Sequence, residues 1–118
     1  MQKIIRNSLL LIALLGSNVF AQSAPAQASE GKALYERICA ACHAPSNVMV
    51  SSPKAGDKAA WARRLQKGLE QTTANAVSGI GAMPARGACT SCSPAQLREA
   101  IRFMAGLETT SGAEQSPP

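Results

Sequence analysis

The sequence predicts a small all-α domain of about four helices. Apolar side chains recur every three or four residues in separate stretches, and residues typical of helix ends stand at their boundaries. No stretch shows the alternation of apolar and polar residues that marks a half-buried strand. The length of 118 residues suits one domain, and no internal repeat is visible.

The first helix is expected from Glu30 to about Ala41, with Ser29 as its N-cap. Its apolar face is formed by Leu34, Tyr35, Ile38 and Cys42. Residues 44–56 are expected to form a loop, because two prolines and a glycine interrupt any periodicity there.

Asp57 is expected to cap a second helix that runs to Lys67 and stops near Gly68. Trp61 and Leu65 share one face of this helix. A short third helix is expected to begin at Thr72 or Thr73, to run through Val77 and to end at Gly79, before a loop over residues 79–87.

The last helix has the clearest start, because Ser93, Pro94 and Gln96 form a capping-box pattern. Gly106 is expected to end it. Its apolar face contains Leu97, Ala100, Ile101 and Met104.

Both ends of the chain are expected to lie outside this domain. Residues 1–21 combine Lys3 and Arg6, an apolar run over residues 9–15 and a small-residue cleavage site ending at Ala21, which predicts a cleaved secretory signal peptide. The alternative, a membrane anchor, is weaker because the run is short of the roughly 20 residues that span a bilayer. Residues 22–29 are expected to be a flexible leader, 30–107 the folded domain and 108–118 a flexible tail.

The composition gives this domain little material for a core. The chain has one Trp, one Tyr and two Phe, and much of its apolar content is Ala. A domain this small usually needs a disulfide, a metal or a cofactor. The 12 basic residues against 7 acidic ones are compatible with an acidic partner, and no basic run with interleaved aromatic residues supports nucleic-acid binding.

Cys39, Cys42 and His43 form a Cys-x-x-Cys-His motif near the end of the first expected helix. Two thiols at this spacing can form thioethers with the two vinyl groups of one porphyrin, and the adjacent imidazole can ligate its iron. This predicts one covalently attached haem, which would also fill the missing core. A signal peptide agrees with it, because such attachment takes place outside the cytoplasm.

Two other readings of the cysteines are weaker. A thiol–disulfide redox pair normally follows a strand, and none is expected. A zinc site with Cys89 and Cys92 would need pairs much closer in sequence, and it leaves His43 without a role. From the residues alone, Cys89 and Cys92 fit either a local structural bridge or a redox-active pair at a helix N-terminus.

The second axial ligand of the iron cannot be another histidine, because His43 is the only one. The candidates are Met49, Met83, Met104, a lysine or an open position. Met83 is favoured because its Gly- and Pro-bearing loop can reach the opposite face of the ring.

These residues resemble class I c-type cytochromes, and the later half of the chain resembles cytochrome c5. Gly31, Tyr35 and Phe103 resemble the contact between the family's first and last helices. Residues 53–61, Pro-Lys-Ala-Gly-Asp-Lys-Ala-Ala-Trp, resemble the segment that supports the proximal histidine and packs on the haem edge. Residues 82–93 resemble the axial-methionine loop and the short disulfide after it.

The resemblance implies a class I cytochrome c fold around one haem. It implies that Pro53 and Trp61 pack around the haem, that Met83 is the distal ligand, and that Cys89 and Cys92 form a disulfide. The expected function is that of a periplasmic single-electron carrier between a donor and an acceptor redox protein, such as a membrane oxidase or reductase. The alternatives are a haem subunit of a periplasmic dehydrogenase complex and, less favoured, a haem peroxidase, which needs an open iron position.

Overall fold

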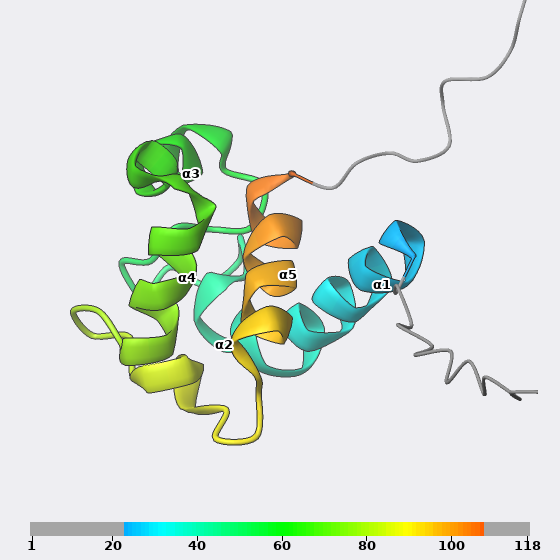
Figure 1. Cartoon of the computed structure of the whole chain (residues 1–118). Coiled ribbons are helices and arrows are strands. Elements are labelled where there is room, and N and C mark those ends of the chain that lie inside the picture. The colour runs from blue at the N-terminus through cyan, green and yellow to red at the C-terminus, as the bar shows by residue number, and fades with distance from the viewer. Residues whose placement is uncertain (1–22, 108–118) are drawn as a thin grey trace, which may run out of the picture.

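The computed structural model describes residues 23–107 and consists of helices joined by loops (Figure 1). The α-helices are α1 (Ala24–Leu34), α2 (Ala40–His43), α3 (Lys58–Arg64), α4 (Gly68–Ser78) and α5 (Pro94–Ala105). A π-helical turn, η1 (Tyr35–Cys39), and two 3₁₀ turns, η2 (Leu65–Lys67) and η3 (Ala85–Ala88), complete the elements. No strand forms within this part of the chain, which confirms the all-α prediction. None of its helices is long and apolar enough to cross a membrane.

α1, η1 and α2 follow one another without a break, so the first helical segment begins at Ala24 and not at Glu30. Its N-cap is Ser23, in extended backbone, and a proline stands in the first turn. The expectation that Ser29 caps the helix was therefore wrong. Residues 24–29, expected in the leader, lack apolar periodicity but contain Ala and Gln, which are strong helix formers. The predicted signal peptide and C-terminal tail lie outside the described residues.

α3 begins as predicted, with the Asp57 side chain accepting a hydrogen bond from the backbone N–H of Ala60 at 3.0 Å. α4 begins at Gly68, earlier than the expected start at Thr72 or Thr73. The two threonine hydroxyls donate back to the carbonyls of residues 68 and 69 at 2.9 Å, so they lie inside the helix instead of capping it.

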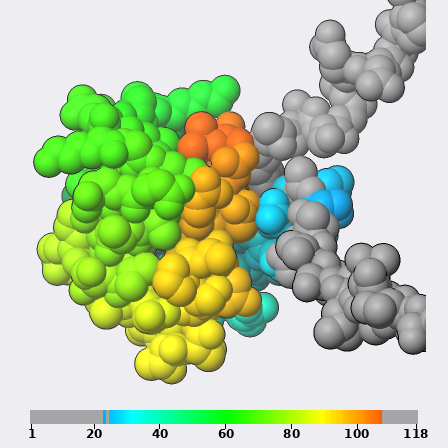
Figure 2. Space-filling model, viewed as in Figure 1, coloured from blue at the N-terminus to red at the C-terminus, as the bar shows by residue number. Residues whose placement is uncertain are grey.

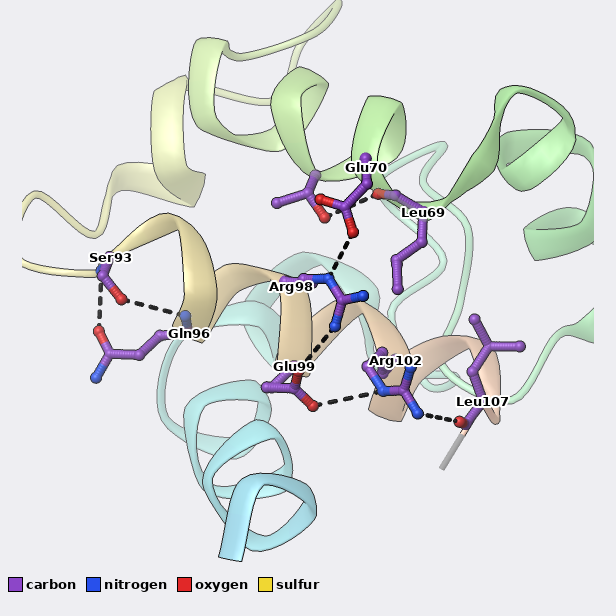
Figure 3. Close-up of polar contacts among 9 residues, drawn as sticks. Leu69, Glu70, Ser93, Gln96, Arg98, Glu99, Arg102 and Leu107 are labelled. Carbon is purple, nitrogen blue, oxygen red and sulfur yellow. Dashed lines mark hydrogen bonds and ion pairs between the residues drawn. The ribbon is translucent and has the colours of Figure 1, made fainter. Parts of the chain in front are cut away.

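α5 has the predicted capping box (Figure 3). The Ser93 hydroxyl accepts from the N–H of Gln96 at 3.2 Å, and the Gln96 side chain accepts from the N–H of Ser93 at 2.9 Å. Gly106 ends the helix in the left-handed region at φ 67°, a conformation that glycine adopts without a steric penalty.

α5 lies between α1 on one side and α4 on the other, and its outer surface stays visible between them (Figures 1 and 2). The core consists of two apolar clusters that share α5. The cluster toward α1 contains Leu34, Cys89, Cys92, Leu97 and Ala100. The cluster toward α3 and α4 contains Trp61, Ala76, Ile101, Met104 and Ala105. We call them the α1 cluster and the Trp61 cluster; Cys39 packs against both.

One exposed ion pair, between Arg98 and Glu70, adds to the contact between α4 and α5 (Figure 3). Arg98 of α5 donates to Glu70 of α4 at 2.8 Å and to Glu99 at 3.2 Å. The hydrogen bond that Arg98 donates to Glu70 is the main cause that raises the pKa of Arg98. Because Arg98 and Glu70 are both solvated, their pair orients the two helices more than it stabilises them.

The close crossing of α1 and α5 depends on a glycine, Gly31, at the point of contact. A Cβ atom on Gly31 would lie 2.4 Å from the carbonyl oxygen of Glu99. Beside this contact, the rings of Tyr35 and Phe103 lie with their centroids 5.0 Å apart. Gly31, Tyr35 and Phe103 therefore form the helix contact that the family resemblance implied.

Gly31→Ala is predicted to lower the free energy of unfolding by about 1–3 kcal/mol, because the helices must separate to admit the methyl group. The direction of the change makes this a sharp test, because replacing glycine by alanine inside a helix ordinarily raises the free energy of unfolding by about 1 kcal/mol. Denaturant unfolding of the mature protein measures the change. An increase in stability would contradict the close approach of the two helices.

Candidate metal centre

The Cys-x-x-Cys-His motif lies at the junction of η1 and α2. Cys39 ends η1 and is half-buried, and burial raises the pKa of its thiol. Cys42 is exposed. Three positions apart on continuous helix, the two side chains lie on the same side, as attachment to one porphyrin requires.

His43 is the last residue of α2, and it is buried with 8% of its surface exposed. Its Nδ1 lies 2.8 Å from the carbonyl oxygen of Pro53. Because a carbonyl only accepts, Nδ1 must carry the proton, and Nε2 keeps the lone pair that a metal ligand needs. The backbone N–H of Ala55 donates to the His43 carbonyl at 2.8 Å, so two hydrogen bonds join the histidine to residues 53–55.

Trp61 also holds the segment of residues 53–55 in place. Its indole, 4% exposed, donates from Nε1 to the Lys54 carbonyl at 2.9 Å. Its ring centroid lies 6.2 Å from that of His43, with 27° between the planes. The tryptophan is thus a neighbour of the imidazole as well as a core residue.

Met83 lies in the tight turn that follows α4. Ile80 and Met83 exchange two backbone hydrogen bonds of 3.0 Å each. Gly79 allows the turn to close, because a Cβ there would lie 2.9 Å from the backbone nitrogen of Ala85. The Met83 side chain is half-buried and packs against the Trp61 cluster. The Trp61 ring in turn lies beside that of His43, so this cluster lies close to both candidate ligands.

The other two methionines considered as ligands lie elsewhere. Met49 is 90% exposed in the loop after α2. Met104 is 4% exposed near the C-terminal end of α5, where it contributes to the Trp61 cluster. Only Met83 combines a loop position with contact to the Trp61 cluster.

Cys89 and Cys92 are joined by a disulfide, with Cα atoms 5.4 Å apart. Both are buried in the α1 cluster, between α1 and α5. Their sulfurs are therefore not available to a four-thiolate zinc site. Within residues 23–107, no group of three or more His, Cys, Asp or Glu side chains is arranged to hold a metal ion, which also argues against zinc.

Sequence reasoning missed the polar residues of the loop after α2. Asn47, Ser52 and Lys54 all donate from their side chains to backbone carbonyls of that helix. A helix end always leaves carbonyls without partners, and polar side chains in the following loop are the available donors. The polar side chains of this loop could therefore have been recognised in the sequence as donors for the end of the helix.

The donors present fit a haem. They are one imidazole with a free Nε2, one thioether in a separate loop and two thiols on one helix face. Haem iron is commonly held by such a His/Met pair, and the apolar side chains of the Trp61 cluster, close to His43 and Met83, suit contact with a porphyrin.

Comparison with known proteins agrees with this assignment. Residues 26–104 match the family described as cytochrome C oxidase, cbb3-type, subunit III. Cytochrome c5 of Ectopseudomonas mendocina is 44% identical over 89 residues, which cover 74% of this chain and 100% of that protein. Cytochrome c-555 of Chlorobaculum tepidum is 38% identical over 97 residues, covering 79% of this chain and 84% of the other.

A solved structure, described as an electron transfer complex of nitrite reductase with cytochrome c, contains a similar chain. The TM-score is 0.58 at 43% identity, over 65% of this chain and 91% of that one.

Helices, donors and matches together define a class I c-type cytochrome with one covalently attached haem c. The chain belongs to the cytochrome c family, and it resembles cytochrome c5. It is a single-electron carrier and not an enzyme.

Trp61→Phe is predicted to lower the free energy of unfolding by about 1–3 kcal/mol, because the Lys54 carbonyl loses its indole donor and a small cavity opens. Denaturant unfolding of the haem-loaded protein measures this. Tyr35→Phe is the control, because it changes another aromatic residue that packs against the Trp61 cluster and removes only its hydroxyl group. Equal losses in the two variants would contradict the role of the indole hydrogen bond.

Proposed function

We propose that this cytochrome carries electrons in the periplasm with its haem tethered through Cys39 and Cys42 and its iron held by His43 and Met83. The observation that carries the proposal is the hydrogen bond from His43 Nδ1 to the Pro53 carbonyl. It leaves Nε2 as the only ring atom that can ligate, on a buried ring whose residue directly follows Cys42 in the chain.

The haem supplies the one-electron couple between ferric and ferrous iron, which His/Met ligation poises at a raised potential. The protein's part is to hold both ligands still. His43 is fixed by two hydrogen bonds to residues 53–55, and Met83 by the closed turn from Ile80. Neither set of bonds involves a group whose charge changes with the iron, so both oxidation states can keep the same backbone.

The periplasm is supported by three observations. The predicted signal peptide would export the chain, and residues 23–107 hold no helix that could span a membrane. A disulfide between Cys89 and Cys92 persists in oxidising compartments. Attachment of haem to Cys39 and Cys42 would follow export.

The partners proposed are a donor and an acceptor redox protein. A similar cytochrome c occurs in a complex with nitrite reductase, which supports a reductase as one class of acceptor. A membrane oxidase or reductase is a second. Permanent association with a dehydrogenase complex is the remaining alternative, and co-purification of a second chain at fixed stoichiometry would favour it.

Met83→Ala is expected to remove the ferric charge-transfer band that is diagnostic of Met ligation and to lower the reduction potential. Met49→Ala is the matched control, because its side chain is 90% exposed and should leave both quantities unchanged. Optical spectra and a redox titration of the haem-loaded proteins measure the two effects. A band that persists in Met83→Ala would assign the distal position to another residue.

The mature protein is expected to begin at Gln22 and to carry the mass of one haem after denaturation. Intact-mass spectrometry tests both points in one spectrum. Alkylation without reduction should label none of the four cysteines, since two are thioethers and two form the disulfide. A bare polypeptide mass, or labelling of Cys39 and Cys42, would contradict the tethered haem.

A further inference from the structure

The loop after α2 satisfies every carbonyl at the end of the haem-attachment helix. Ala44 N–H donates to the carbonyl of residue 40 at 3.1 Å, and Ala55 N–H to that of residue 43 at 2.8 Å. The Asn47 side chain donates to the carbonyl of residue 41 at 2.6 Å. The remaining carbonyl, that of Cys42, accepts two side-chain hydrogen bonds.

Those two bonds come from Ser52 and Lys54. The Ser52 hydroxyl donates to the Cys42 carbonyl at 2.6 Å, and the Lys54 ammonium donates to the same oxygen at 3.0 Å. Lys54 also donates to the Val50 carbonyl at 2.7 Å and to the Ser52 hydroxyl at 3.0 Å. All three ammonium protons are therefore used, and the side chain has one defined position.

None of these acceptors carries a charge. Lys54 is half-buried, and it forms no ion pair with any Asp or Glu among residues 23–107. Its positive charge is thus not neutralised by a carboxylate side chain of residues 23–107. It lies instead at the negative end of the helix dipole, against the carbonyl between Cys42 and His43.

We propose that Lys54 is a positioning residue that holds a fixed positive charge beside the haem-attachment helix and thereby favours ferrous over ferric iron. The proposal rests on the function proposed above. Reduction adds one negative charge to the centre, and a nearby cation stabilises that state. Lys54 also cancels part of the negative helix end, which would otherwise favour the more positive ferric state.

The backbone around Lys54 supports the histidine. Lys54 follows Pro53, whose carbonyl accepts from His43, and its own carbonyl accepts from Trp61. A merely structural role would therefore show as lost stability. An electrostatic role would show as a changed ratio of ferrous to ferric protein at a fixed ambient potential.

The test is a redox titration of the haem-loaded wild type and of the Lys54→Met and Lys54→Arg variants, with Lys58→Met as the matched control. Lys58 is an exposed lysine at the start of α3, so its substitution removes the same charge from the surface. Lys54→Met should lower the ferrous-to-ferric ratio roughly three- to tenfold, the scale of a unit charge acting through partly screened protein. Lys54→Arg should stay within roughly twofold of wild type, because it keeps the charge.

Salt provides the second arm. The effect of Lys54→Met should persist at high ionic strength, because a half-buried charge is screened less than an exposed one, whereas any effect of Lys58→Met should fade. If Lys54→Met does not fold, Lys54→Gln replaces it and retains an amide donor. An unchanged ratio in the folded uncharged variant would overturn the proposal while leaving the haem assignment intact. A wild type without haem would instead refute the proposed function.

Discussion

A ring nitrogen that donates to a backbone carbonyl leaves only its partner nitrogen to bind a metal, and in this chain that constraint organises the site. His43 Nδ1 is paired with the Pro53 carbonyl, so the position of residues 53–55 determines the tautomer and direction of the imidazole. Those residues are in turn fixed by the indole of Trp61 and by the N–H of Gly56, which donates to the Met104 carbonyl at 2.8 Å. The orientation of the histidine therefore depends on α3 and α5 as well as on its own helix.

The second constraint is the small amount of apolar surface available. Two modest clusters share α5, and Cys39 is the residue that packs against both. A macrocycle attached at that residue would lie beside each cluster and would add the apolar area that an alanine-rich chain lacks. The disulfide between Cys89 and Cys92 lies just before α5 and is buried in the α1 cluster, so it fixes the local backbone and adds buried sulfur where bulky side chains are few.

Local signals in the sequence predicted local structure well. The predicted caps lie at the helix ends in the structure: Asp57 and Ser93 at the starts, and Gly106 at an end. Capping depends on residues a few positions apart, so the sequence alone is enough to predict it. The start of α1 was missed because helix propensity without apolar periodicity gives no face to recognise. The motif identified the donors, but not Asn47 or Lys54, because their acceptors on the preceding helix are reached only when the loop folds back.

The arrangement explains how one fold can serve two charge states of its cofactor. An electron carrier works best when the geometry around the iron is the same before and after transfer, since every atom that must move adds to the barrier. Here the supports of both candidate ligands are hydrogen bonds to uncharged backbone groups, between His43 and residues 53–55 and between Met83 and Ile80. The loop after α2 goes further, because it pairs every carbonyl at the end of that helix with a donor of its own. No polar group there is left to reorient when the charge on the iron changes, so the protein can stabilise one state over the other by fixed charges alone.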